Sequence, residues 1–199
     1  MQHRLFACFF ALALLWSSAM AADEAPDALV QRLVAEAAES APSGGAEAML
    51  AFVDAKVMPH VDFARMTASA VGRSWRQATP EQQARLQQEF KLLLVRSYAG
   101  ALTQLKDLTV SVKPLRASPE DTELVVRSVV KGHGDALQLD YRMRKSAEGW
   151  KICDINVMGV WLVDTYRGQF SGEINAHGID GLIATLAQRN RPMKLAAAQ

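Results

Sequence analysis

The sequence is poor in cysteine, in histidine and in any excess of one charge. Two cysteines in 199 residues cannot form a disulfide framework, and four scattered histidines argue against a dense metal site. Lysine and arginine number 22 against 21 acidic residues, so the basic excess typical of nucleic-acid-binding proteins is missing. Hydrophobic residues make up 50% of the chain, which excludes disorder and predicts one domain, or two small ones, with a real core. We therefore expect a binding protein or a small enzyme, without a nucleic-acid partner.

Motifs for catalysis, metal binding and cofactor binding are also missing. No serine lies in a nucleophile elbow, and no His-Glu-x-x-His pattern occurs. Gly132 and Gly134 lie between two predicted strands and precede no helix, which favours a tight turn over a dinucleotide loop. His60 and Asp62 offer two metal ligands, but no glutamate or cysteine nearby completes a set, and turn and capping roles explain both. We predict no catalytic residue, no metal and no cofactor.

A long hydrophobic run occurs only at the start of the chain. Arg4 precedes an apolar run from Leu5 to Trp16, and Ala19-Met20-Ala21 places small residues at the two positions that signal peptidase reads. The competing interpretation, a membrane anchor, needs roughly 20 apolar residues, more than this run offers. We predict a signal peptide at residues 1–21, cleaved after Ala21, and a mature protein that is soluble in the periplasm.

Cleavage would change both the cysteine content and the charge. Cys8 would be lost, and Cys153 alone cannot form an intramolecular disulfide in an oxidising compartment. No histidine or cationic pattern near Cys153 suggests an activated thiol, so we interpret it as a small buried strand residue. Loss of Arg4 leaves equal numbers of acidic and basic residues in the mature chain.

Helical spacing of apolar residues covers the first half of the mature chain. It extends over residues 26–41 and over 46–57, where Pro59 ends the second helix. Asp62 is placed to cap a third, short helix that runs through Ser69.

The strongest helix start is at Thr79. Thr79 suits the N-cap, Pro80 the first helical position, and Gln82 the third position, from which it can reach back to the cap. The helix that follows carries an apolar stripe from Leu86 to Leu105 that is wider than one helix contact requires. It is therefore either the central helix of the core or, in part, the lining of a cavity.

After Lys106 the hydrophobic pattern changes to a period of two. Four segments are typical of strands: 109–113, 122–131, 137–144 and 150–157. The third is the clearest, because its apolar residues alternate strictly with polar ones from Leu137 to Arg144. We predict an antiparallel meander with one apolar face and one face toward water.

Helical spacing returns over 163–170 and 180–188, and residues 189–199 are small, polar or proline-containing. We predict a single domain over 22–188 and a flexible C-terminal tail over 189–199. Helices before and after a sheet indicate an α+β fold in which helices pack on one face of a curved antiparallel sheet.

Charged residues offer two further candidates for chemistry. Asp140 and Asp154 lie on neighbouring predicted strands, where an inward-facing carboxylate can act as a general base. Alternation places Asp140 on the polar side, which favours a solvent-facing charge paired with Arg142 or Lys151.

A second candidate is a cationic group, Arg65, Arg73 and Arg76, with Trp75 among them. These side chains could bind an anion, although a solvated helix face explains them better. The apolar run from Val157 to Val163 is open between two interpretations, ordinary core packing and one wall of an apolar pocket.

Several blocks of the sequence resemble the MlaC family. They are VMPHVDFARM (57–66), AVGRSWRQATPEQ (70–82), YAGAL (98–102), DINVMGV (154–160), TYRGQF (165–170) and GIDGLI (178–183). The resemblance covers nearly all of the mature chain in order, and it departs from the family at Trp161, where we expect a smaller residue such as serine. A bulky side chain there would either narrow a pocket or point outward.

The resemblance implies a periplasmic phospholipid shuttle of the Mla, or toluene-tolerance, ABC transport system, which maintains outer-membrane lipid asymmetry. Its expected partners are phospholipid, an outer-membrane lipoprotein–porin complex and an inner-membrane ABC transporter complex. The implied fold is similar to NTF2-like domains, with the acyl chains in a deep apolar pocket and the headgroup near its mouth.

We expect ten apolar or aromatic side chains to line this lipid-binding pocket. They are Leu94, Tyr98, Val126, Val130, Leu139, Tyr141, Met143, Val157, Val160 and Tyr166. Two other classes of protein remain open: an NTF2-like enzyme with an inward-facing carboxylate, and an adaptor with a filled core that binds no lipid.

Overall fold

The computed structural model describes residues 24–40, 42, 45–103, 109–118, 120–131 and 136–191. The predicted signal peptide, the predicted turn at Gly132–Asp135 and most of the predicted tail lie outside these ranges. Within them, no helix is long and apolar enough to cross a membrane.

Helices occupy both ends of the described chain. They are α1 (Pro26–Ser40), α2 (Gly45–Phe52), the π-helical η1 (Val53–Val57), the 3-10 helix η2 (Met58–His60), α3 (Phe63–Val71), the 3-10 helix η3 (Gly72–Gln77), α4 (Pro80–Thr103) and α5 (Leu162–Arg189). The single helix predicted over 46–57 is wrong after Phe52. Pro59 has no backbone N–H with which to continue the α-helical hydrogen bonds, and the chain passes through π and 3-10 turns as it approaches this residue.

The two helix caps predicted at Asp62 and Thr79 are confirmed. The Asp62 Oδ1 atom accepts a hydrogen bond from the Arg65 backbone N–H at 3.0 Å, which caps α3. At the start of α4, the Thr79 N–H donates to Gln82 Oε1 at 3.0 Å, and the Gln82 N–H donates to Thr79 Oγ1 at 3.2 Å. These two reciprocal bonds satisfy backbone donors that a helix N-terminus otherwise leaves unpaired.

The two C-terminal helices predicted from the sequence form one element, α5, with a kink. Gly178 lies inside it at φ 71° and ψ −176°, a conformation that only glycine adopts without strain. The helix ends at Arg189, and Asn190 is buried with its Nδ2 atom donating to the Glu89 carbonyl at 2.9 Å and to Glu89 Oε2 at 2.8 Å. The folded part therefore extends past residue 188.

The sheet has five strands in sequence order. They are β1 (Thr109–Val112), β2 (Glu123–Lys131), β3 (Leu137–Ser146), β4 (Gly149–Val157) and β5 (Val160–Trp161), and every neighbouring pair is antiparallel. The predicted α+β class and antiparallel meander are confirmed. The short β5 was not predicted, because a two-residue strand carries no periodicity.

Register assigns the two faces of the sheet. Val126 lies opposite Tyr141, which lies opposite Ile155, so these three apolar side chains share one face. Arg142 and Asp154 lie opposite each other on the other face. A register shift between Arg142 and Met143 changes the alternation within β4 and keeps apolar residues on the first face beyond it.

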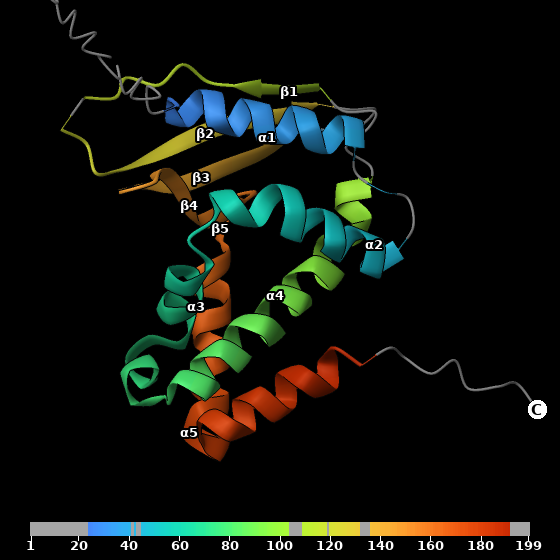
Figure 1. Ribbon diagram of the computed structural model, residues 1–199, viewed down its shortest axis with the longest axis vertical. Coiled ribbons are helices and arrows are strands. Elements are labelled where there is room, and N and C mark those ends of the chain that lie inside the picture. Colours follow the sequence, from blue (N-terminus) through green and yellow to red (C-terminus); the bar gives the residue numbers. More distant parts are fainter. Residues whose placement is uncertain are drawn as a thin grey trace, which may run out of the picture.

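The molecule has a sheet layer and a helical layer. The helix α1 lies across the sheet and packs against β1 and β2, while α3, α4 and α5 extend away from the β4 side (Figure 1). The two layers join along the part of β4 that β5 leaves unpaired. There the Asp62 N–H donates to the Ile152 carbonyl at 2.8 Å, and Val61 forms a parallel bridge with Ile152.

Candidate functional site

Among the residues that the structure describes, the apolar core is divided into three clusters. The sheet cluster joins α1 to the apolar sheet face: Leu29, Val30, Leu33, Val126, Tyr141, Met143, Trp150 and Ile152. The helix cluster joins α3, α4 and α5: Phe63, Met66, Ala70, Val71, Leu86, Phe90, Val163, Tyr166, Phe170, Leu182 and Leu186. A third, smaller cluster consists of Met49, Val53 and Val95.

The clusters meet through apolar side chains that are only partly buried. Val61 packs against both the sheet cluster and the helix cluster, and Met58 packs against both the helix cluster and the third cluster. Half-buried Val34, Leu139 and Ile155 extend the sheet cluster. A closed core would bury such residues, so we identify this apolar seam between the layers as the candidate functional site.

The ten predicted pocket residues fall in different surroundings. Val126, Leu139, Tyr141 and Met143 belong to the sheet cluster or pack against it. Val130 is buried on the same face of β2, and half-buried Val157 lies opposite Leu139. The structure thus brings together the six predicted residues that come from the sheet.

The remaining four come from the helices and the last hairpin. Leu94 packs against the helix cluster, and Tyr98 is half-buried one turn further along α4. Tyr166 lies inside the helix cluster, edge-on to Phe90 with ring centroids 5.0 Å apart. Val160 is 56% exposed.

The exposed Val160 belongs to a tight hairpin between β4 and β5. Met158 and Gly159 form its turn with positive φ angles of 53° and 89°, and the Gly159 N–H donates to Asn156 Oδ1 at 2.8 Å. Met158 is 72% exposed. The apolar run from Val157 to Val163 is therefore neither wholly core nor wholly wall, because its first half turns outward and its last two residues are buried at the start of α5.

Tyr141 places a polar hydroxyl group on the apolar face of the sheet. Its side chain is 7% exposed, and burial raises the pKa of its phenol above the ordinary value of 10.0. A hydrogen bond with the Ser128 side chain opposes part of this shift in pKa. Ser128 is itself fully buried and donates to the Leu139 carbonyl at 3.0 Å, so both hydroxyl groups have partners within the protein.

Among the described residues, Asp154 is the most deeply buried carboxylate, at 2% exposure. Its Oδ1 atom accepts from the backbone N–H groups of Ile155 at 2.9 Å and Val163 at 3.1 Å, and Arg142 donates to Oδ2 at 3.3 Å. Burial raises its pKa, and the two backbone bonds and Arg142 oppose that rise. Because Val163 lies in the first turn of α5, Asp154 caps this helix from a neighbouring strand.

The prediction for Asp140 is half wrong. Register places it on the polar face, as predicted, but its side chain is only 8% exposed. Its partner is Gln138, whose Nε2 donates to both carboxylate oxygens at 3.1 and 3.0 Å, instead of Arg142 or Lys151. Lys151 donates to the Pro59 carbonyl at 2.7 Å and pairs with Glu148 at 3.1 Å. Alternation fixes only the face, and it cannot reveal which other residues cover that face.

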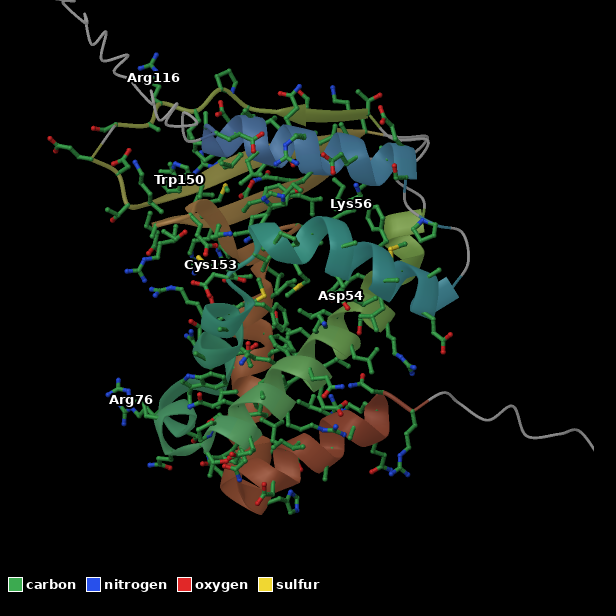
Figure 2. All side chains as sticks on the ribbon, viewed as in Figure 1. Asp54, Lys56, Arg76, Arg116, Trp150 and Cys153 are labelled. Atoms are coloured by element: carbon green, nitrogen blue, oxygen red, sulfur yellow. The ribbon has the colours of Figure 1, made fainter. Side chains whose placement is uncertain are left out.

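The predicted cationic group separates in space. Arg73 and Arg76 are exposed on η3, and Arg76 points away from the body of the molecule (Figure 2). Trp75 packs against the helix cluster. Arg65 instead lines a polar pocket with Arg142 and Arg167, two residues that are distant in sequence and that no local pattern connects to it.

Cys153 is free and buried where β4 meets α3 (Figure 2). Its Sγ atom lies 3.4 Å from the Arg142 carbonyl oxygen, and burial raises the pKa of its thiol to about 11. Within the part of the chain that the structure describes, no group of three or more histidine, cysteine, aspartate or glutamate side chains is placed to hold a metal ion.

Comparison with known families places this arrangement in context. The model of the MlaC protein family matches residues 27–188, which is most of the chain. The chain belongs to the MlaC family.

Two curated relatives of this MlaC-family chain are bacterial proteins. A toluene tolerance protein, ttg2D, from Pseudomonas putida is 29% identical over 105 residues, 53% of this chain and 49% of that protein. The intermembrane phospholipid transport system binding protein MlaC from Haemophilus influenzae is 23% identical over 136 residues, 66% of this chain and 64% of that protein. The chain thus spans about half to two thirds of the length of these relatives.

A solved structure shares the fold along nearly its whole length. It is the phospholipid-binding protein from Ralstonia solanacearum in complex with a phospholipid, and it is 43% identical to this chain with a TM-score of 0.79. The match covers 85% of this MlaC-family chain and 97% of the Ralstonia chain.

The one departure expected within the MlaC family, Trp161, has a place on the polar side of the sheet. Trp161 lies opposite Asn156 and so shares the face that carries Asp154. The Arg142 guanidinium stacks over its ring, 4.2 Å from the centroid. Trp161 therefore points away from the apolar face and does not narrow a pocket there.

Proposed function

We propose that the protein is a periplasmic carrier that holds phospholipid in the apolar seam between its sheet layer and its helical layer. The observation that carries the proposal is the divided core, in which partly buried apolar side chains such as Val61 connect clusters that are each well packed. Family membership and the Ralstonia homologue, solved with a phospholipid bound, support the same cargo.

The physical need for such a carrier follows from the insolubility of lipid. Each methylene transferred from water to an apolar environment gains about 0.8 kcal/mol, so exposing a chain of roughly 16 carbons costs on the order of 12 kcal/mol. Two chains double this cost, which makes unassisted transfer through water very slow. A dry apolar site removes the cost without requiring tight contacts to the headgroup, which would hinder release.

The lining of the site follows from burial. We propose that the half-buried residues among the ten, Leu94, Tyr98, Leu139 and Val157, touch the acyl chains. The fully buried Val126, Val130, Tyr141 and Met143 form the wall behind them on the sheet side, and Tyr166 supports the wall on the helix side. Val160, on the exposed hairpin, lies at the edge of the site.

The route of the cargo is part of the same proposal. The apolar run at residues 5–16 supports export by a cleaved signal peptide at residues 1–21, with a lipid-binding domain from residue 22. The relatives' membership in toluene-tolerance and intermembrane phospholipid transport systems supports transfer between an outer-membrane lipoprotein–porin complex and an inner-membrane ABC transporter.

The contacts of the buried carboxylates favour a carrier over an NTF2-like enzyme. A general base needs an oxygen that is free to take a proton from a substrate. Both oxygens of Asp154 are engaged by Ile155, Val163 and Arg142, and both oxygens of Asp140 accept from Gln138. Neither residue lies on the apolar face of the sheet.

Native mass spectrometry of the protein purified from the periplasm tests the proposal. We expect a mass increment equal to a phospholipid, and organic extraction should release that lipid for headgroup and chain analysis. The adaptor alternative predicts a protein that carries no lipid and takes none from phosphatidylethanolamine vesicles. That result would contradict the carrier function.

The variant Leu139→Asp sharpens the test, because Leu139 is half-buried on the apolar face. A charge at this position should reduce lipid loading more than it reduces folding, since the cost of burying the charge rises when lipid displaces water. Thr109→Asp on the exposed edge of β1 is the matched control and should load normally. Equal loss of loading and of folding in Leu139→Asp would assign Leu139 to the ordinary core.

A further inference from the structure

A polar pocket of about 90 Å³ lies on the face of the sheet opposite the apolar seam. Glu123, Arg142 and Asp154 contribute from the strands, and Arg65, Ser69 and Arg167 contribute from α3 and α5. This volume holds a few waters or one small oxyanion.

The charges that line the pocket are unequal. Three guanidinium groups face two carboxylates, which leaves the lining with one net positive charge. The first turn of α5 also borders the pocket at Val163, where the helix dipole adds partial positive charge. The pocket therefore favours an anionic occupant.

The protein uses only part of the hydrogen-bonding capacity of these arginines, each of which has five N–H donors. Arg142 donates one N–H to Asp154, and Arg167 donates to the Ser69 carbonyl at 2.9 Å and pairs with Asp164 at 3.2 Å. The Arg65 guanidinium makes no hydrogen bond or ion pair with any residue in the described ranges. Several donors at the pocket thus remain available to a ligand.

The two carboxylates of the pocket do not occupy the remaining arginine N–H donors. The oxygens of Asp154 accept hydrogen bonds from Arg142 and from two backbone N–H groups, and the bond with Arg142 fixes the position of that guanidinium. Glu123 is exposed at the start of β2 and forms no hydrogen bond or ion pair within the described ranges. Arg142 is fixed from a second direction by its stacking on Trp161, so one of the three cations is preorganised.

We propose that this pocket binds a phosphate group that carries one negative charge, such as a phosphodiester. One such charge balances the net charge of the lining, and guanidinium groups match the geometry of phosphate oxygens. The occupant is separate from the proposed lipid cargo, because the apolar seam lies on the opposite face of the sheet. A soluble phosphate ester and the headgroup of a lipid in a membrane surface both present this chemistry.

Titration of the purified protein with glycerophosphoglycerol, a soluble phosphodiester that carries one negative charge, tests binding directly, with sodium chloride at matched ionic strength as the reference. Backbone amide signals near Val163 and side-chain Nε–H signals of the arginines should shift and saturate with the phosphate ester only. Arg65→Gln should weaken binding about 10-fold, as expected for one lost charge-assisted hydrogen bond. Arg73→Gln, which removes the same charge from exposed η3, should stay within about twofold of wild type.

Vesicle flotation separates the two sources of phosphate. Binding to phosphatidylglycerol vesicles that Arg65→Gln abolishes and Arg73→Gln does not would identify a membrane headgroup as the ligand. Binding of glycerophosphoglycerol without vesicle binding would identify a soluble phosphodiester. The proposal is overturned if neither probe binds, or if the two variants weaken binding equally, because the effect would then reflect general charge.

Lipid cargo provides an independent readout. Extraction of phospholipid from Arg65→Gln should give the wild-type amount, since Arg65 lies outside the apolar seam. Failure of phosphate binding would contradict the phosphate pocket and not the proposed carrier function. Absence of lipid from the wild-type protein would contradict the carrier function and not the phosphate pocket.

Discussion

At the scale of single residues, Cys153 shows how burial controls reactivity. Burial raises the pKa of its thiol from 9.0 to about 11, which lowers the thiolate population at neutral pH about a hundredfold. We predict that 5,5′-dithiobis(2-nitrobenzoate) at pH 8 labels the protein without residues 1–21 only after unfolding in guanidinium chloride. Cys153→Ser should abolish the signal in both states. Native labelling within tenfold of the unfolded rate would contradict the burial of the thiol.

Tyr141 gives a pH-dependent prediction at the same scale. Its folded pKa lies above the ordinary value of 10.0, so its contribution to stability is fully present below pH 10 and is lost as pH rises through the folded pKa. Tyr141→Phe should cost about 1 kcal/mol at pH 7 through the lost hydrogen bond with Ser128. The gap to wild type should narrow above pH 10, because phenylalanine has no proton to lose. Urea denaturation between pH 7 and 11 measures both effects, and a constant gap would contradict the shifted pKa.

At the scale of elements, Asp154 decides how α5 attaches to the sheet. Asp154→Ala leaves the Val163 N–H and the Arg142 guanidinium without their acceptor, which should cost about 3 kcal/mol in free energy of unfolding. Asp154→Asn retains one acceptor oxygen and should cost less. Asp164→Ala, in the same first turn but exposed, should cost less than about 1 kcal/mol. Urea denaturation checks this ranking, and equal costs for the two alanine variants would show that Asp154 does not cap the helix.

The kink in α5 provides a second element-scale prediction. Gly178→Ala forces a side chain into φ 71° and ψ −176°, so it should destabilise the protein by about 1–3 kcal/mol even though a Cβ there meets no neighbouring atom. Gly172→Ala, at an open helical position of the same element, should be neutral or stabilising by up to about 1 kcal/mol. Thermal unfolding of the two variants measures the difference. If α5 had no kink at residue 178, neither substitution would destabilise the protein.

At the scale of the whole molecule, the sequence predicts elements well and their assembly less well. Helix caps at Asp62 and Thr79 and the alternation of β3 are local patterns, and the structure confirms them. The cap of α5 by Asp154 and the partner of Asp140 were missed, because each depends on which segment covers the polar face of the sheet. For the same reason, sequence placed Arg65 with its neighbours in the chain instead of with Arg142 and Arg167.

The divided core has a consequence for stability. If lipid fills the seam between the sheet cluster and the helix cluster, it completes the contact between two layers that otherwise join along one edge of β4. A ligand that binds only the folded state stabilises it in proportion to the logarithm of its concentration, by about 2.7 kcal/mol at a hundredfold excess over the dissociation constant. The lipid-free protein should therefore be folded but less stable.

We predict that removing lipid by organic extraction or refolding lowers the melting temperature by several degrees and increases binding of the dye 1-anilinonaphthalene-8-sulfonate, which reports exposed apolar surface. Readdition of phosphatidylethanolamine should reverse both changes in wild type, and in Leu139→Asp it should reverse neither. Far-UV circular dichroism should stay unchanged throughout, because each cluster retains its own packing. Identical melting with and without lipid would mean that the two layers support each other fully without cargo, as in an adaptor with a filled core.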